Sequence, residues 1–186
     1  MNMKLTMRWA VMVVIAALPT SAFAQSYPKT LAASAEASVS YAKLSATFTI
    51  QVDRLMRDQD FMKVADALKY GGYPRFLPAL RQLPVVGRLQ IGEMKFDLKY
   101  ARERPANKSQ LVLVADRPVY FFGGGSIDPK AKGGYELTIL ELDLDASGIG
   151  QGTMAAAARV KPSGDGGVIV DDYGVAPFRL MVKPAK

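Results

Sequence analysis

Carboxylates are the main candidate acid–base groups of this sequence, because it contains no histidine and no cysteine. The two absences exclude a thiolate nucleophile, an imidazole base, a disulfide and a zinc site built from these residues. The most visible carboxylates are Asp116, Asp171 and Asp172, and Tyr120 and Tyr173 could assist them. A glycosidase needs only two carboxylates at a defined separation, so the set indicates a hydrolase as one functional alternative. The same aspartates are also typical of turns.

The segment 143–148, DLDASG, matches the oxygen-rich opening of a calcium-binding loop, with glycine at the sharp turn. Its candidate ligands are Asp143, Asp145 and Ser147. The twelfth position of such a loop carries a bidentate glutamate, but here that position is Met154. Because Asp, Ser and Gly are also the usual residues of a hairpin turn, the sequence favours a turn over a metal site. We expect no high-affinity metal and no cofactor.

An aromatic group follows the glycine pair at 71–72: Tyr73 and Phe76, with Arg75 between them and Tyr70 just before the pair. Aromatic side chains beside a mobile loop are common walls of ligand pockets. These four residues are therefore candidate ligand-binding residues. The alternative is ordinary packing of helices over a sheet.

Strict alternation of apolar and polar residues over 44–52 predicts a half-buried strand. In this pattern Phe48 and Ile50 point into the core, whereas Thr47 and Thr49 point away from it.

The period changes after this strand. Apolar residues at 61, 64, 65 and 68 form one stripe of a helix, which Gly71-Gly72 would stop. Pro74 suits the first turn of a second helix, and Pro84 ends it. The sequence thus predicts two short helices, inserted after the first strand.

The chain after Pro84 alternates between strand and turn signals. Strands are expected within 94–100, 111–115, 119–122, 135–144, 153–160, 168–170 and 178–182. The alternation slips at Ile139-Leu140, which predicts a β-bulge. Short connections favour antiparallel pairing. The expected fold class is α+β and β-dominated, with a curved antiparallel sheet of about seven or eight strands, either a sandwich or an open barrel.

Residues 1–24 have the three parts of a signal peptide. Lys4 and Arg8 form a basic start, residues 9–18 form an apolar run, and Ala22-Phe23-Ala24 is a small-x-small cleavage site. The apolar run is about half the length of a membrane-spanning helix. We therefore expect export to the periplasm or the medium, and no integral membrane protein after cleavage.

Cleavage is expected before Gln25, which leaves a flexible lead-in over 25–38 and a single β-rich domain over 39–186. The net charge is +7 for the whole chain and falls to +5 without the two basic residues of the signal. This charge favours anionic surfaces such as lipid headgroups or acidic glycans. Because the basic residues are scattered rather than clustered, no nucleic-acid partner is expected.

The C-terminal region contains the strings GYEL at 134–137, GTMAAAARVK at 152–161 and DYG at 172–174. In these strings the chain resembles small exported bacterial proteins, over roughly the last third to half of its length. The resemblance implies no activity, cofactor or functional residue.

The sequence features that stand out are export, β-patterning and hairpin turns. They favour an exported envelope or secreted protein that acts as a non-enzymatic binding module for an apolar ligand or a protein partner. Its partner would be an envelope protein, a lipid or an acidic glycan. The alternative is a carboxylate-based hydrolase acting on envelope glycans, which the pairing of Asp116, Asp171 or Asp172 in a cleft would favour.

Overall fold

The computed structural model describes residues 26–39, 42–104, 107–119, 133–164, 167–173 and 177–185. It describes only the backbone at 37–39, 42–44 and 107–109. The expected signal peptide, Tyr120 and most of the predicted strand at 119–122 lie outside the described residues.

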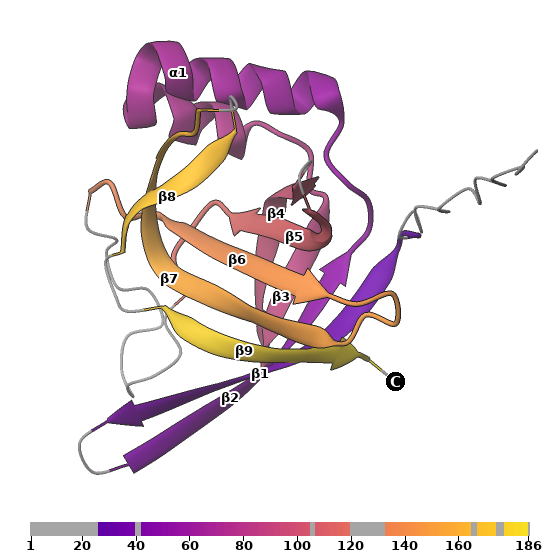
Figure 1. The fold of residues 1–186 in the computed structure, drawn as a ribbon. Helices are drawn as coiled ribbons and strands as arrows, with labels where there is room; N and C mark the ends of the chain where they lie inside the picture. The colour runs from indigo at the N-terminus through magenta and orange to yellow at the C-terminus, as the bar shows by residue number, and fades with distance from the viewer. Residues whose placement is uncertain are drawn as a thin grey trace, which may run out of the picture.

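The described chain forms nine strands and one helical element (Figure 1). The strands are β1 (Lys29–Val39), β2 (Ala42–Val52), β3 (Gly87–Ile91), β4 (Met94–Arg104), β5 (Asn107–Ala115), β6 (Leu137–Leu144), β7 (Gly150–Pro162), β8 (Val168–Tyr173) and β9 (Phe178–Pro184). The helical element, α1 (Asp58–Arg81), lies between β2 and β3. All strand pairs are antiparallel, as the short connections predicted.

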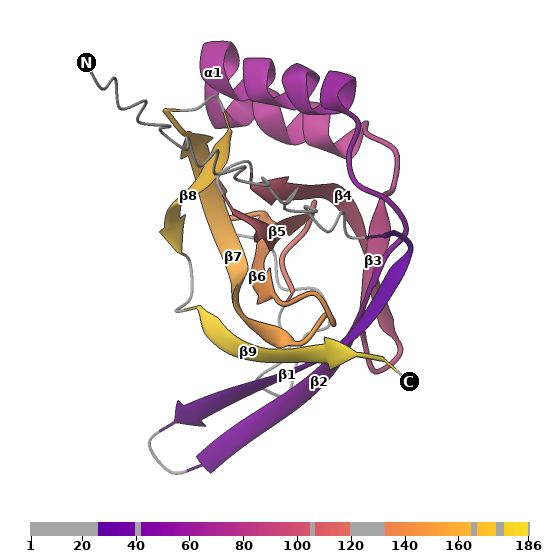
Figure 2. The same ribbon diagram turned by 45° about the vertical axis from the view of Figure 1, so that its right-hand side comes forward.

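Eight of the strands close into a barrel (Figure 2). The hydrogen-bonded order is β6-β5-β4-β3-β2-β1-β9-β7, and the pairing of β7 with β6 completes the ring. The other edge of β7 is shared, since β9 pairs with residues 150–154 and β8 with residues 158–162. The β-dominated class is confirmed, but the barrel is closed rather than open, and it is not a sandwich.

Closure depends on β1, in a segment that the sequence suggested was a flexible lead-in. This strand pairs with β2 along its whole length and with β9 over residues 31–36. Leu31, Ala33 and Ala35 are buried in the barrel. The prediction failed because alanine and serine provide little contrast in hydrophobicity between the two faces of a strand.

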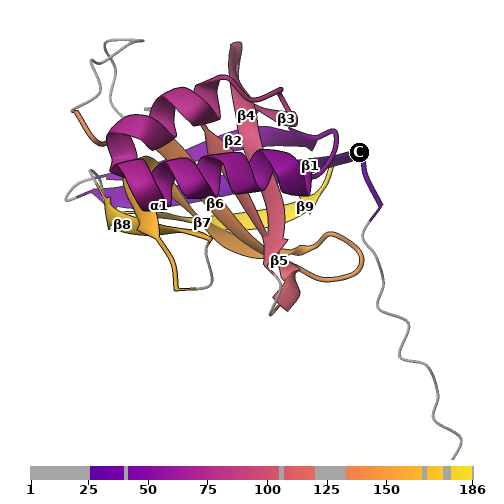
Figure 3. The same cartoon turned by 90° about the horizontal axis from the view of Figure 1, so that it is seen from above.

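The helical part also differs from the prediction of two short helices after the first strand. α1 is one element, it follows the second strand, and it is kinked at Gly72. Gly72 has φ 64° and ψ −170°, a conformation that is essentially restricted to glycine. The glycine stop and Pro74 therefore mark a sharp bend, and the two arms of α1 lie side by side (Figure 3).

Two clusters of buried side chains hold these layers together. The first fills the barrel and includes Leu31, Ile50, Leu89, Leu98, Leu113, Leu142, Met154 and Leu180, one from each barrel strand. The second lies between α1 and the outer faces of β4, β5, β6 and β7, and includes Val64, Leu68, Phe76, Leu80, Val114, Ile139 and Ala158. No helix in the described part of the chain is long and apolar enough to cross a membrane.

The apolar residues of β6 are explained by these two clusters. The β5–β6 register is unbroken from Gln110 opposite Asp143 to Ala115 opposite Thr138. The β6–β7 register does shift, between Leu137 and Ile139, but the extra residue lies in β7 rather than at Ile139-Leu140. Ile139 belongs to the cluster beneath α1, whereas Leu140 belongs to the barrel core. The strand is apolar on both faces because both faces are covered.

Candidate functional site

The segment predicted as either a calcium loop or a turn connects β6 with β7. Oδ1 of Asp145 accepts hydrogen bonds from the Ser147 hydroxyl (2.6 Å), the Ser147 backbone N–H (2.8 Å) and the Ile149 backbone N–H (3.0 Å). These bonds, that of the Ser147 hydroxyl first, lower the pKa of the Asp145 carboxyl below its ordinary value. Asp143 lies within β6, opposite Gln151. Within the described residues, no cluster of three or more acidic side chains is placed to hold a metal ion.

Two of the candidate carboxylates, Asp171 and Asp172, lie on β8 and have separate partners. Asp171 forms ion pairs with Arg159 (2.9 Å) and Lys161 (3.2 Å). The Tyr135 hydroxyl donates a hydrogen bond to Asp172. Hydrogen bonds from Lys161 and Arg159 lower the pKa of Asp171, and the bond from Tyr135 lowers that of Asp172. These contacts favour the ionised form of both carboxyls, whereas a general acid needs the opposite shift, toward the working pH.

The third candidate, Asp116, follows β5 and lines an open groove of about 380 Å³ with Asp97, Arg81 and Arg117. Its backbone carbonyl accepts a hydrogen bond from Arg81 Nη2 (3.3 Å). The structure thus places Asp116 beside Asp97, a residue that the sequence did not single out. The only available signal for Asp97 was its position on the polar face of the predicted strand at 94–100.

The four residues of α1 predicted to bind a ligand have different surroundings. Phe76 is buried in the cluster beneath α1, whereas Tyr70 and Arg75 are exposed. The Tyr73 hydroxyl donates to the Glu136 carboxylate (2.7 Å), and burial, followed by this hydrogen bond, raises the pKa of Tyr73. The contacts of Phe76 and Tyr73 are those of packing between α1 and the sheet, the alternative that the sequence left open.

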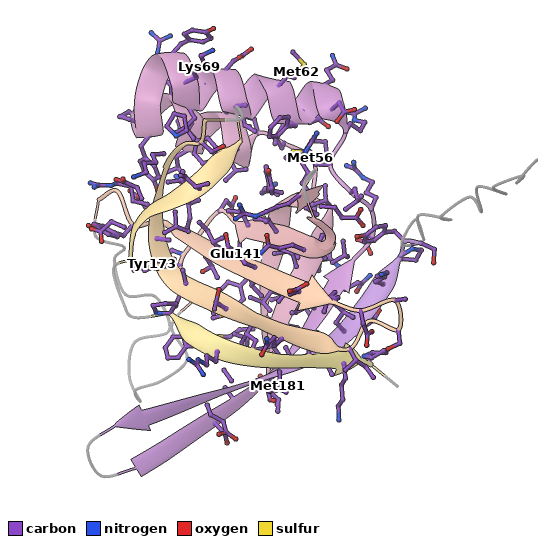
Figure 4. The ribbon with its side chains drawn as sticks, in the orientation of Figure 1. Met56, Met62, Lys69, Glu141, Tyr173 and Met181 are labelled. Atoms are coloured by element: carbon purple, nitrogen blue, oxygen red, sulfur yellow. The ribbon has the colours of Figure 1, made fainter. Side chains whose placement is uncertain are left out.

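A groove of about 560 Å³ crosses the outer face of β2, β1 and β9. The middle of the groove is hollow because β1 contributes only small residues there, Ala32, Ala33 and Ser34. Thr47 of β2 and Met181 of β9 lie on either side of Ser34. Met181 is 67% exposed and Ile149, at one end of the groove, is 53% exposed. Figure 4 shows Met181 on the outside of the barrel, where β9 crosses β1. The groove therefore combines small residues with exposed apolar side chains.

The edge of β2 beside this groove is open. β2 pairs with β1 over residues 42–52 but with β3 only over residues 49–52. Over 42–48, no other described strand pairs with this side of β2. In Figure 1 the β1–β2 hairpin extends beyond the barrel. One edge of this part of β2 thus has no partner strand within the described part of the chain.

Two backbone hydrogen bonds show which residues of β2 face the open edge. Ala185 N–H donates to the carbonyl of Thr30 (3.0 Å), so the backbone groups of Thr30 point toward β9. Because successive residues of a strand point their backbone groups to opposite sides, the even-numbered residues of β1 bond to β9 and its odd-numbered residues bond to β2. Asp53 N–H donates to the carbonyl of Val86 (2.9 Å), which places the odd-numbered residues of β2 on the β3 side. The backbone N–H and C=O groups of Thr47 therefore point to the open edge.

Comparisons of the chain with models of known protein families, with curated protein sequences and with solved structures found no match. Function is therefore inferred from the residues and their geometry.

Proposed function

We propose that this protein is an exported, non-enzymatic binding module that holds an extended segment of a partner protein along the open edge of β2. The observation that carries this proposal is the edge of β2 at Ser45 and Thr47, beside the groove, where no strand of the described residues pairs with it. An extended peptide adds to such an edge through backbone hydrogen bonds, and its alternate side chains provide specificity.

The groove indicates the chemistry of the partner segment. In an added strand every second side chain lies on the outer face of the sheet. A long apolar side chain at such a position would lie over Thr47 and Ser34, toward Met181. The preferred segment of the partner protein is therefore extended and uncharged, and it contains a large apolar residue.

A free apolar ligand inside the barrel has less support. The inward-facing side chains of the eight barrel strands pack into one buried cluster. A free ligand on the outer groove would also leave the edge of β2 unpaired, although open edges are a known liability of β-sheets.

A periplasmic or secreted location is part of the proposal. The basic start, apolar run and cleavage site within residues 1–24 support it. The partner would then be another protein of the envelope. The hydrolase alternative has less support, because the contacts of Asp171 and Asp172 favour the ionised form of both, whereas a two-carboxylate mechanism needs one protonated acid.

The test uses short random peptides, displayed and selected for binding to the exported protein. Selected peptides are expected to protect the backbone amides of Ser45 and Thr47 from hydrogen exchange. Thr47→Pro removes the N–H that faces the open edge, so peptide affinity should fall about tenfold, the worth of one good hydrogen bond. Thr47→Val keeps the N–H and the branched shape, and should bind like the wild type.

Thermal melting of Thr47→Pro provides the folding control, since the N–H at this position does not bond to β1. Equal peptide affinity for the wild type and a folded Thr47→Pro variant would contradict the proposal. If an apolar dye bound, and Met181→Glu but not Thr47→Pro abolished its binding, the groove would instead be a site for free apolar ligands.

A further inference from the structure

One side of α1 faces away from the sheet and exposes two large apolar side chains. Tyr70 is 76% exposed and Met62 is 61% exposed. Val64 and Leu68, on the opposite side of the same arm, are buried against the sheet. Figure 4 shows Met62 and Lys69 above α1, on its far side from the barrel. We define the outer surface of α1 by five exposed residues: Met62, Lys63, Lys69, Tyr70 and Arg75.

Three of these five side chains are basic. Lys63 and Lys69 are each seven positions from one of the two apolar residues, a spacing that places residues on the same face of a helix. The side-chain stem of Arg75 crosses Gly71 at the bend, since a Cβ added to Gly71 would lie 2.2 Å from Arg75 Cδ. Within the described residues, none of the three basic side chains forms an ion pair. Their charges are therefore available to a partner.

The acidic residues of α1 offset only part of this charge. Asp58 pairs with Arg102 (2.9 Å) and Asp60 pairs with Arg57 (2.8 Å), both at the start of α1. The remaining acidic residue of α1 is Asp66, which is exposed on the first arm. The outer surface of α1 thus presents three basic side chains against one carboxylate. Such an excess of positive charge fits an anionic partner.

The shape of the outer surface of α1 favours a membrane over a small ligand. Small ligands bind in hollows, but no residue of this surface lines the groove on β2, β1 and β9 or the groove at Asp116. A lipid surface needs no hollow, because apolar side chains enter it between the headgroups while basic side chains remain at the phosphates. The Lys69 ammonium lies 5.1 Å from the centroid of the Tyr70 ring. A cation and an aromatic ring thus share one place, as is typical of membrane interfaces.

We propose that the outer surface of α1 binds a membrane that contains anionic lipids. Met62 and Tyr70 enter the headgroup region, and the three basic side chains contact the lipid phosphates. These two apolar residues are eight positions apart, about 12 Å along the helix axis, so the first arm of α1 lies in the plane of the membrane. In Figures 1 and 2 the β1–β2 hairpin lies at the other end of the molecule from α1. The membrane site is therefore separate from the open edge of β2 and independent of the proposed function.

The test is co-sedimentation of the exported protein, at low ionic strength, with vesicles of phosphatidylcholine that contain or lack phosphatidylglycerol. Binding is expected only to the vesicles that contain phosphatidylglycerol. Lys69→Glu should weaken this binding at least about fivefold, the worth of one basic residue near an anionic membrane. Lys183→Glu is the matched control, because it makes the same change of charge at an exposed residue of β9, away from α1.

A fluorescence measurement tests whether the apolar side chains enter the membrane. The only tryptophan of the chain, Trp9, lies in the expected signal peptide, so Met62→Trp gives the exported protein a single tryptophan. Its emission should shift to shorter wavelength when vesicles with phosphatidylglycerol are added. The emission of Met181→Trp should not shift, although Met181 on β9 is 67% exposed and Met62 is 61% exposed.

The proposal is overturned if the protein does not bind the vesicles with phosphatidylglycerol, or if Lys183→Glu weakens binding as much as Lys69→Glu. It is also overturned if the emission of Met62→Trp does not shift. Binding of an acidic polysaccharide, polygalacturonate, in place of the vesicles would overturn it as well, and would assign the outer surface of α1 to an acidic glycan.

Discussion

Phe48 and Thr49 are neighbours on β2 with opposite surroundings. Phe48 is 3% exposed within the barrel core, whereas Thr49 is exposed on the outer face. Phe48→Ala should therefore lower the free energy of unfolding by about 3–5 kcal/mol, the usual cost of truncating a buried aromatic residue. Thr49→Ala should cost less than about 1 kcal/mol. Chemical denaturation measures both values, and equal losses would contradict the assigned faces of β2.

Asp145 shows how a turn residue makes stability depend on pH. Its folded pKa lies below the ordinary value of 3.8, chiefly because the Ser147 hydroxyl donates to the carboxylate. The hydrogen bonds to the Asp145 carboxylate therefore stabilise the fold fully at pH values above 3.8, and this stabilisation is lost as the pH falls through the lower, folded pKa. Ser147→Ala should move the titration midpoint of Asp145 upward, as carboxyl resonances would show. An unchanged midpoint would mean that the backbone N–H groups alone determine the shift.

At the scale of the element, the bend of α1 depends on one residue. Gly72 adopts a positive φ that other residues rarely adopt. Gly72→Ala should therefore cost about 1–3 kcal/mol of unfolding free energy. Gly164→Ala is the matched control, because Gly164 lacks a positive φ and an added Cβ would contact nothing within 4 Å. Equal stability of the two variants would show that α1 bends for another reason.

The alanine run of β7 shows how packing selects one of two local preferences. Alanine has the best intrinsic helix propensity, yet residues 155–158 lie in a strand, in agreement with the strand expected within 153–160. Ala156 faces the barrel core, whereas Ala155 and Ala158 face α1. The strand is held between two partners, and small side chains let α1 approach the sheet.

At the scale of the whole molecule, the barrel requires β1 between β2 and β9. A chain that begins at Val39 would lack this strand and leave both neighbours without a partner on one side. We expect it to lose cooperative thermal melting, whereas a chain that begins at Gln25 should melt in one transition. Near-ultraviolet circular dichroism distinguishes the two results. If the shorter chain melted at the same temperature, β1 would be dispensable for closure.

The sequence alone determined the elements in which hydrophobicity has a clear period or a breaker residue stands out. The alternation at 44–52 corresponds to β2, and the glycine pair at 71–72 marks the kink of α1. These features are local, because a period reports which sides of one element are covered. The same reasoning missed β1, whose alanines and serines provide little contrast. It also predicted a bulge within β6, whereas the extra residue at the nearby register shift lies in β7.

Only the tertiary structure decided which elements meet. Closure of the barrel joins β1 to β9, and Glu36 thereby comes opposite Arg179. The open edge of β2 exists because β3 pairs with only part of it. The physical reason is that a barrel brings together residues far apart in sequence through the register of its strands. No local pattern of residue types records that register.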